Sequence, residues 1–177
     1  MAVFFTADLH LGHENIIKYR NRPFKSAQEM NETIVSKWNE RVREEDMVYF
    51  LGDLCLPSRD YAKWLKQLKG NIVWIKGNHD SDKAPVKTEL TMTIEGHVIV
   101  MYHYPIKVWD RKHYGSWHLY GHSHGTMKEL NGLSLDVGVD KWDFYPVNLN
   151  SVIVHMNWLR RSHSNKELGL LEEVPML

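Results

Sequence analysis

The chain has 177 residues, with 22 basic and 22 acidic side chains and 11 histidines. This length predicts one domain with a substantial core, and the balanced charge excludes a general attraction to nucleic acid or anionic lipid, although a local basic patch stays open. Cys55 is the only cysteine, which excludes an internal disulfide and favours a reducing compartment. Because Met1–Ala7 does not resemble a signal peptide and no apolar run reaches the roughly 18 residues of a membrane span, we expect a cytoplasmic protein with no membrane partner.

The first part of the chain predicts alternating strands and helices. Val3–Ala7, Met47–Leu51 and Ile72–Lys76 are short apolar runs typical of buried strands. The helices between them are predicted to be capped by Ser26 and by Ser58. This β-α-β-α-β order implies parallel strands, and such sheets bind ligands beyond the carboxyl ends of the strands.

The pattern changes after residue 90. Thr91–Ile94 and Val98–Tyr102 predict a hairpin, and Trp117–Tyr120 predicts a further strand. Met127–Leu130 and Leu133–Val137 predict a second hairpin.

The end of the chain predicts a closing helix over Asn148–Arg160. We therefore expect a single domain over residues 1–160 and a tail, which could be mobile, over residues 161–177.

The predicted strands end in side chains that bind metals. In Tyr120–Gly125 two histidines stand two residues apart between glycines, and residues i and i+2 of an extended chain point to the same side. A His-x-His pair alone could equally be a solvated loop, and Asp8 could instead cap a helix. The complete set of polar side chains at strand ends is Asp8, His10, Asp53, Asn78, His79, His103, His122 and His124.

These segments resemble the motif blocks of the calcineurin-like metallophosphoesterases, and their opening resembles a small subgroup that is often from phages or bacteria. The matching blocks are Asp8-Leu9-His10, Gly52-Asp53, Gly77-Asn78-His79-Asp80, His103 after a strand, and Gly121-His122-Ser123-His124. The resemblance implies an α/β fold, a four-layer sandwich of two mixed β-sheets flanked by α-helices.

The resemblance also implies a pair of divalent metal ions. Carried over by motif, one ion takes Asp8, His10, Asp53 and His124, and the other takes Asp53, Asn78, His103 and His122, so that Asp53 bridges them. Mixed oxygen and nitrogen ligands favour Mn, with Fe, Zn, Co or Ni as alternatives, and they disfavour a calcium site.

The implied activity is phosphoester hydrolysis, by in-line attack of a hydroxide that bridges the two metals. His79 is expected to protonate the leaving oxygen or to stabilise the transition state, and its alternative is an orienting role. Leu56 stands where many family members carry an aspartate that orients the catalytic histidine. Another group must therefore hold His79, and the candidates are Asp80, Asp82, a backbone carbonyl or water.

The sequence says less about the substrate. The chain predicts no accessory domain that could grip duplex DNA or a protein, so we favour a small phosphodiester such as a nucleotide or cyclic nucleotide. The alternatives are a phosphomonoesterase acting on a nucleotide, sugar phosphate or phosphopeptide, and a binding scaffold without catalysis; nucleic acid stays open as a partner, and the sequence does not indicate an oligomeric state. Six side chains are expected to face the substrate unless their loops are merely solvated: His13, Arg22, Lys107, Arg111, His113 and Tyr114.

Overall fold

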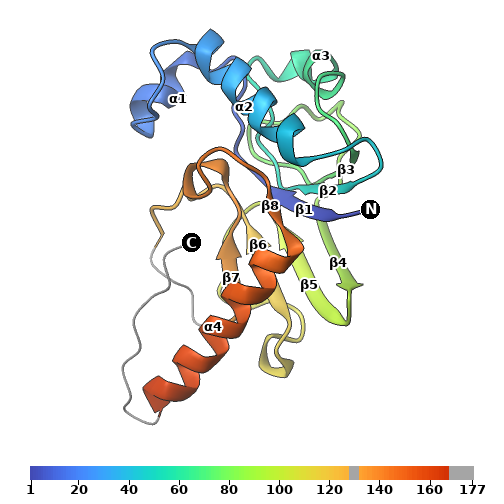
Figure 1. The fold of residues 1–177 in the computed structure, drawn as a ribbon, viewed down its shortest axis with the longest axis vertical. Coiled ribbons are helices and arrows are strands. Elements are labelled where there is room, and N and C mark those ends of the chain that lie inside the picture. Colours follow the sequence, from blue (N-terminus) through green and yellow to red (C-terminus); the bar gives the residue numbers. More distant parts are fainter. Residues whose placement is uncertain (128–131, 168–177) are drawn as a thin grey trace.

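A computed structural model describes residues 1–127 and 132–167 of the chain, which form two four-stranded sheets (Figure 1). The first sheet contains β1 (Val3–Thr6), β2 (Met47–Phe50), β3 (Asn71–Trp74) and β8 (Val147–Asn148), in the order β3-β2-β1-β8. The first three strands are parallel, and β8 is antiparallel to β1. The carboxyl ends of β1, β2 and β3 therefore lie at one edge, as their sequence order predicts.

The second sheet contains β4 (Glu89–Ile94), β5 (His97–Tyr102), β6 (Trp117–Tyr120) and β7 (Ser134–Asp136), in the order β4-β5-β6-β7. The β4–β5 pair is the predicted hairpin, whereas β5, β6 and β7 are parallel. The second predicted hairpin lies partly outside the described residues, and its segment Leu133–Val137 contains β7, which pairs with β6 in parallel. Both sheets are mixed, so the expected fold class is confirmed.

In the described part of the chain, four α-helices flank the sheets: α1 (Glu14–Tyr19), α2 (Ala27–Arg41), α3 (Tyr61–Leu65) and α4 (Leu149–Glu167). In Figure 1, α1, α2 and α3 lie on the outer side of the first sheet. The long helix α4 contacts β1, β7 and β8, and it extends beyond the predicted end at Arg160. No helix within residues 1–127 and 132–167 is long and apolar enough to cross a membrane.

The two predicted helix caps have different outcomes. The Oγ of Ser26 accepts a hydrogen bond from the backbone N–H of Glu29 at 3.2 Å, which confirms the predicted cap of α2. The cap at Ser58 is wrong, because Ser58 lies inside a 3₁₀ turn (Ser58–Asp60) and α3 begins only at Tyr61.

Alternation along the strands divides the core into two clusters. In β1 and β2, Phe5 and Tyr49 face the second sheet and α4, whereas Phe4, Val48 and Phe50 face α2 and α3. The first sheet is therefore covered on both faces, which fixes its register and the positions of the loops that leave its edge.

Candidate metal centre

The loops that follow β1, β2, β3, β5 and β6 converge. The backbone N–H of Asp8 donates to the carbonyl oxygen of Gly52, and that of Gly121 donates to the carbonyl oxygen of His103. The two sheets are joined at this edge by a bridge between Ala7 and Gly138. Gly121 is required by this close approach, since a Cβ there would lie 2.5 Å from the Cβ of Ala7. The expectation that the polar strand ends share one edge is met across both sheets.

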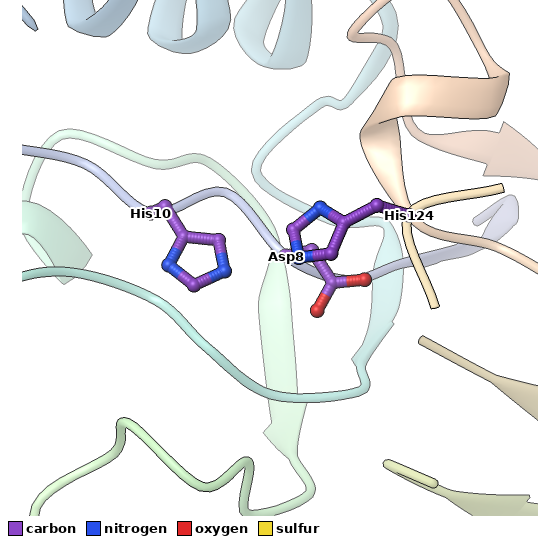
Figure 2. A group of neighbouring side chains, drawn as sticks. All are labelled: Asp8, His10 and His124. Carbon is purple, nitrogen blue, oxygen red and sulfur yellow. The ribbon is translucent and has the colours of Figure 1, made fainter. Parts of the chain in front are cut away.

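One group of side chains consists of Asp8, His10 and His124 (Figure 2). One ligand atom from each lies within 4.8 Å of the others, and the rings of His10 and His124 stack with centroids 5.2 Å apart. The carboxylate of Asp8 accepts the backbone N–H of His122 at 2.8 Å, so it does not cap α1, whose N-cap residue is His13.

A second group consists of Asp53, His103 and His122, again with one atom from each within 4.8 Å of the others. The Oδ1 of Asn78 lies 3.1 Å from His103 Nε2 and 3.0 Å from His122 Nδ1. The structure thus brings together the four side chains that the motif comparison assigns to one ion.

Asp53 stands between the two groups. Its Oδ2 lies 3.5 Å from His10 Nε2 and 3.6 Å from His103 Nε2, while its Oδ1 accepts the backbone N–H of His79 at 2.9 Å. The same carboxylate oxygen, Oδ2, is therefore directed to His10 of the first group and to His103 of the second, which is the arrangement that a bridging ligand requires.

The unpaired atoms of these groups fit divalent cations. His10 Nε2 is buried and has no hydrogen-bond partner among the residues that the structure describes. His103 Nδ1 lies 2.7 Å from the carbonyl oxygen of Leu51, which can only accept, so in the neutral ring the lone pair of Nε2 faces Asp53 and Asn78. The lone pair of His103 Nε2 and the carboxylate of Asp53, 3.6 Å apart, repel each other unless a cation lies between them.

Electrostatics inside the groups agree with this fit. Burial, followed by the nearby carboxylates of Asp136 and Asp53, raises the pKa of Asp8 well above its usual range. Burial, followed by the neighbouring His124, lowers the pKa of His10 far below its usual range. A neutral imidazole is the form that binds a metal, and a bound cation would offset the repulsion among the carboxylates.

Backbone conformation marks the same positions. Residues other than glycine with positive φ are uncommon, and they concentrate where function requires strain. Five of the predicted ligands have this conformation: Asp8 (φ 61°), His10 (53°), Asp53 (61°), His122 (65°) and His124 (49°).

His79 and His13 lie at the mouth of the centre. The ring of His79 approaches the edge of His10 with centroids 5.2 Å apart, and His13 Nδ1 lies 3.4 Å from His10 Nδ1. Asp80 is not the group that holds the His79 ring, because its carboxylate accepts the backbone N–H groups of Asp53, Leu54 and Gly77 and the indole N–H of Trp74. Asp82 pairs with Lys76 instead.

Three residues expected at the rim lie elsewhere, and this expectation is corrected. Arg111 and Tyr114 line a separate hollow of about 510 Å³ beside Gly96, and His113 contacts Tyr114 in the turn Lys112–Tyr114. Since β5 and β6 are parallel, their connection must return to the opposite end of the sheet. Lys107 lies on the same connection, where it is exposed and outside the lining of the central cavity.

Arg22 is also misplaced by the sequence interpretation. It is 5% exposed and lies behind the centre, where its guanidinium forms a bidentate pair with Asp140. It therefore does not present its charge to a substrate.

Several residues near the centre escape the sequence analysis. Asp140 accepts from His124 Nδ1 at 2.7 Å, and Asp136 accepts from Ser123 Oγ and the backbone N–H of Gly125. Asp136 is the last residue of β7 and Asp140 lies four residues further along the chain, so a search for polar side chains near strand ends beyond residue 124 would have found them. Tyr19 and Arg20, at the end of α1, line the central cavity of about 420 Å³ together with His10, His13, Ile16, Asp53, His79, His122 and His124.

The fold and this candidate centre place the chain in the class of α/β phosphoesterases. Residues 1–135 match the calcineurin-like phosphoesterase superfamily domain, and the chain belongs to this family. It is 35% identical over 161 residues to the uncharacterized protein MJ1445 of Methanocaldococcus jannaschii, covering 85% of this chain and 89% of that protein. It is 24% identical to the gene 66 protein of Mycobacterium phage L5, covering 78% of this chain and 86% of that protein. A solved structure, the protein of unknown function AQ665 from Aquifex aeolicus, has the same fold, with a TM-score of 0.67, 21% identity, and coverage of 86% of this chain and 98% of that one.

Proposed function

We propose that the chain is a phosphoester hydrolase that depends on two divalent metal ions and acts on a small phosphodiester, such as a nucleotide or cyclic nucleotide. The observation that carries this proposal is Asp53, whose Oδ2 is within 3.6 Å of one histidine from each ligand group. Asp8, His10, Asp53 and His124 would hold one ion, and Asp53, Asn78, His103 and His122 would hold the other. Mn is the favoured metal for this mixture of carboxylate, amide and imidazole ligands, and Fe, Zn, Co and Ni are alternatives.

When bound, such a pair of ions polarises phosphoryl oxygens and supplies an activated water. The protein's own part is to orient the ester and to move a proton. His79 is exposed at the mouth, and its backbone N–H is fixed on Asp53, so its ring can reach the oxygen that leaves the phosphorus. We assign it the transfer of a proton to that oxygen.

The lining of the cavity supports a small substrate with one aromatic portion. A volume of about 420 Å³ lies in the range of small-ligand sites. The guanidinium of Arg20 can pair with a phosphate oxygen that points outward, and the exposed ring of Tyr19 offers a surface on which a base can stack. Together with His13, which lines the cavity as expected, these two residues take the place of Lys107, Arg111, His113 and Tyr114.

Hydrolysis of bis-p-nitrophenyl phosphate and of p-nitrophenyl phosphate by the Mn²⁺-loaded protein tests the proposal. Faster turnover of the diester supports it, and faster turnover of the monoester favours the phosphomonoesterase alternative. No turnover of either compound or of cyclic nucleotides, by protein shown to hold two ions, would support the scaffold alternative. An Arg20→Gln variant should raise KM for nucleotide and p-nitrophenyl substrates alike, because Arg20 would pair with a phosphate oxygen that all of them carry.

A further inference from the structure

The buried, positively charged side chain of Arg22 lies directly behind the candidate metal centre. The guanidinium of Arg22 donates to both oxygens of Asp140 at 2.8 Å, to the carbonyl oxygens of Asp8 (2.7 Å) and Leu9 (3.0 Å), and to the sulfur of Met30 (3.4 Å). A guanidinium has five N–H donors, and these contacts use all five. Arg22 therefore holds, from behind, the backbone of the segment that carries Asp8 and His10.

The partner of this cation contacts the other half of the same ligand group. Asp140 Oδ2, which accepts from Arg22, also lies 2.7 Å from His124 Nδ1. Because both oxygens of Asp140 accept from the permanently charged guanidinium of Arg22, this carboxylate is ionised. An ionised carboxylate can only accept, so Nδ1 of His124 carries the proton and the lone pair of Nε2 is left for a ligand.

We propose that Arg22 and Asp140 form a positioning pair, which fixes the Asp8–His10 segment and the His124 ring relative to each other and sets the His124 tautomer for binding one metal ion. The inference rests on the proposed metal centre. Arg22 and Asp140 would not touch an ion themselves. They would act through Asp8, His10 and His124, and therefore on one of the two proposed ions.

Stability alone is a poor explanation for the pair. A buried ion pair is often no more stabilising than an apolar substitute of the same volume. Here the charges come from segments 118 positions apart, and each charge also contacts a predicted ligand segment with φ in the strained left-handed region. Residues that hydrogen-bond to metal ligands in this way typically change metal affinity by about 10–100-fold when substituted.

The second ligand group supplies an internal comparison. His103 is held by the carbonyl oxygen of Leu51. Within the described residues, neither Arg22 nor Asp140 hydrogen-bonds to His103, Asn78 or Asp53. The positioning pair should therefore affect one binding site and leave the other unchanged, whereas general destabilisation would weaken both.

The test measures metal binding rather than activity. Titration calorimetry with Mn²⁺, together with native mass spectrometry, gives the affinity and number of ions for the wild type, Asp140→Asn, Arg22→Lys and the control Lys37→Met. The control removes another ion pair, Lys37–Asp143 at 2.8 Å, which lies outside the centre. We expect Asp140→Asn and Arg22→Lys to weaken one of two sites by about 10–100-fold, while the control binds as the wild type does.

Wild-type affinity at both sites in folded Asp140→Asn or Arg22→Lys would overturn the inference and leave the proposed function standing. Wild-type protein that binds no pair of ions would instead overturn the proposed function, and the inference with it. Imidazole ¹⁵N spectra of the metal-free wild type provide a readout that does not depend on how a variant folds. They should show His124 with its proton on Nδ1, and a proton fixed on Nε2 would equally overturn the inference.

Discussion

Asp53→Asn is the substitution that examines the shared carboxylate most directly. The amide oxygen can still accept the backbone N–H of His79, which Asp53 Oδ1 accepts at 2.9 Å, so the loop should keep its shape. The change removes the negative charge that lies between His10 and His103. We therefore expect both ligand groups to lose metal affinity together.

The magnitude follows from linkage. An ion that binds only the folded state at 100 times its dissociation constant adds about 2.7 kcal/mol to the free energy of unfolding. For a domain of this size each kcal/mol raises Tm by about 2–4 °C, so one occupied site should raise Tm by about 5–11 °C and two sites by about twice that. Asp53→Asn should lose most of this increase.

Scanning calorimetry with and without Mn²⁺, and with EDTA as the metal-free reference, measures the effect. Asp143→Asn is a matched control, because it removes the same charge from another aspartate with positive φ. The side chain of Asp143 is 78% exposed and belongs to neither ligand group. An Asp53→Asn protein whose Tm rises with Mn²⁺ as much as that of the wild type would refute the bridging role.

Three further predictions concern single residues. His79→Ala should lower kcat for the preferred ester by about 10²–10⁴-fold while native mass spectrometry still finds the wild-type number of ions; loss of the ions would make His79 a ligand. Gly121→Ala should lower the free energy of unfolding in urea by about 1–3 kcal/mol and weaken Mn²⁺ binding, because the new Cβ would lie 2.5 Å from Ala7 Cβ. In the control Gly96→Ala the new Cβ meets no atom of the described residues within 4 Å, so Mn²⁺ binding should be unchanged. Burial lowers the pKa of His118 from 6.5 to about 4, so His118 binds a proton at a higher pH in the unfolded chain than in the folded protein. The free energy of unfolding should therefore fall by up to about 3 kcal/mol as the pH drops from 6.5 to 4. Urea titrations across this pH range should find a smaller fall for His118→Gln, and an equal fall would show that His118 is not the source.

The strand-end pattern allowed the centre to be located from the sequence because parallel strands leave little freedom. Once β1, β2 and β3 are parallel, Asp8, Asp53 and Asn78 must emerge at the same edge. The same rule could place His103 and His122, since β5 and β6 are parallel within the second sheet. What the rule could not supply is the docking of the two sheets, which depends on packing between Phe5, Tyr49 and the inner side chains of the second sheet.

The errors have physical causes. Order along the chain suggested that Arg111 and Tyr114, lying between two ligand blocks, would be at the rim, but a connection between parallel strands crosses the whole sheet. Arg22 was expected to face the substrate because it lies in the predicted loop around Arg22-Pro23-Phe24. Its partner Asp140 is 118 positions away, and periodicity gives no indication of such a pairing.

The junction between the two sheets has a consequence for how the centre assembles. Asp8, His10, Asp53 and Asn78 follow strands of the first sheet, whereas His103, His122 and His124 follow strands of the second. Neither sheet alone therefore carries a full set of ligands for either of the two proposed ions. A chain in which both sheets are formed but have not yet docked would hold ions weakly and singly. Tight binding of a second equivalent of metal would then indicate that the two sheets have docked, which is the last step of folding. A chelator would weaken the packing between the two sheets before it affected the pairing of strands within each sheet.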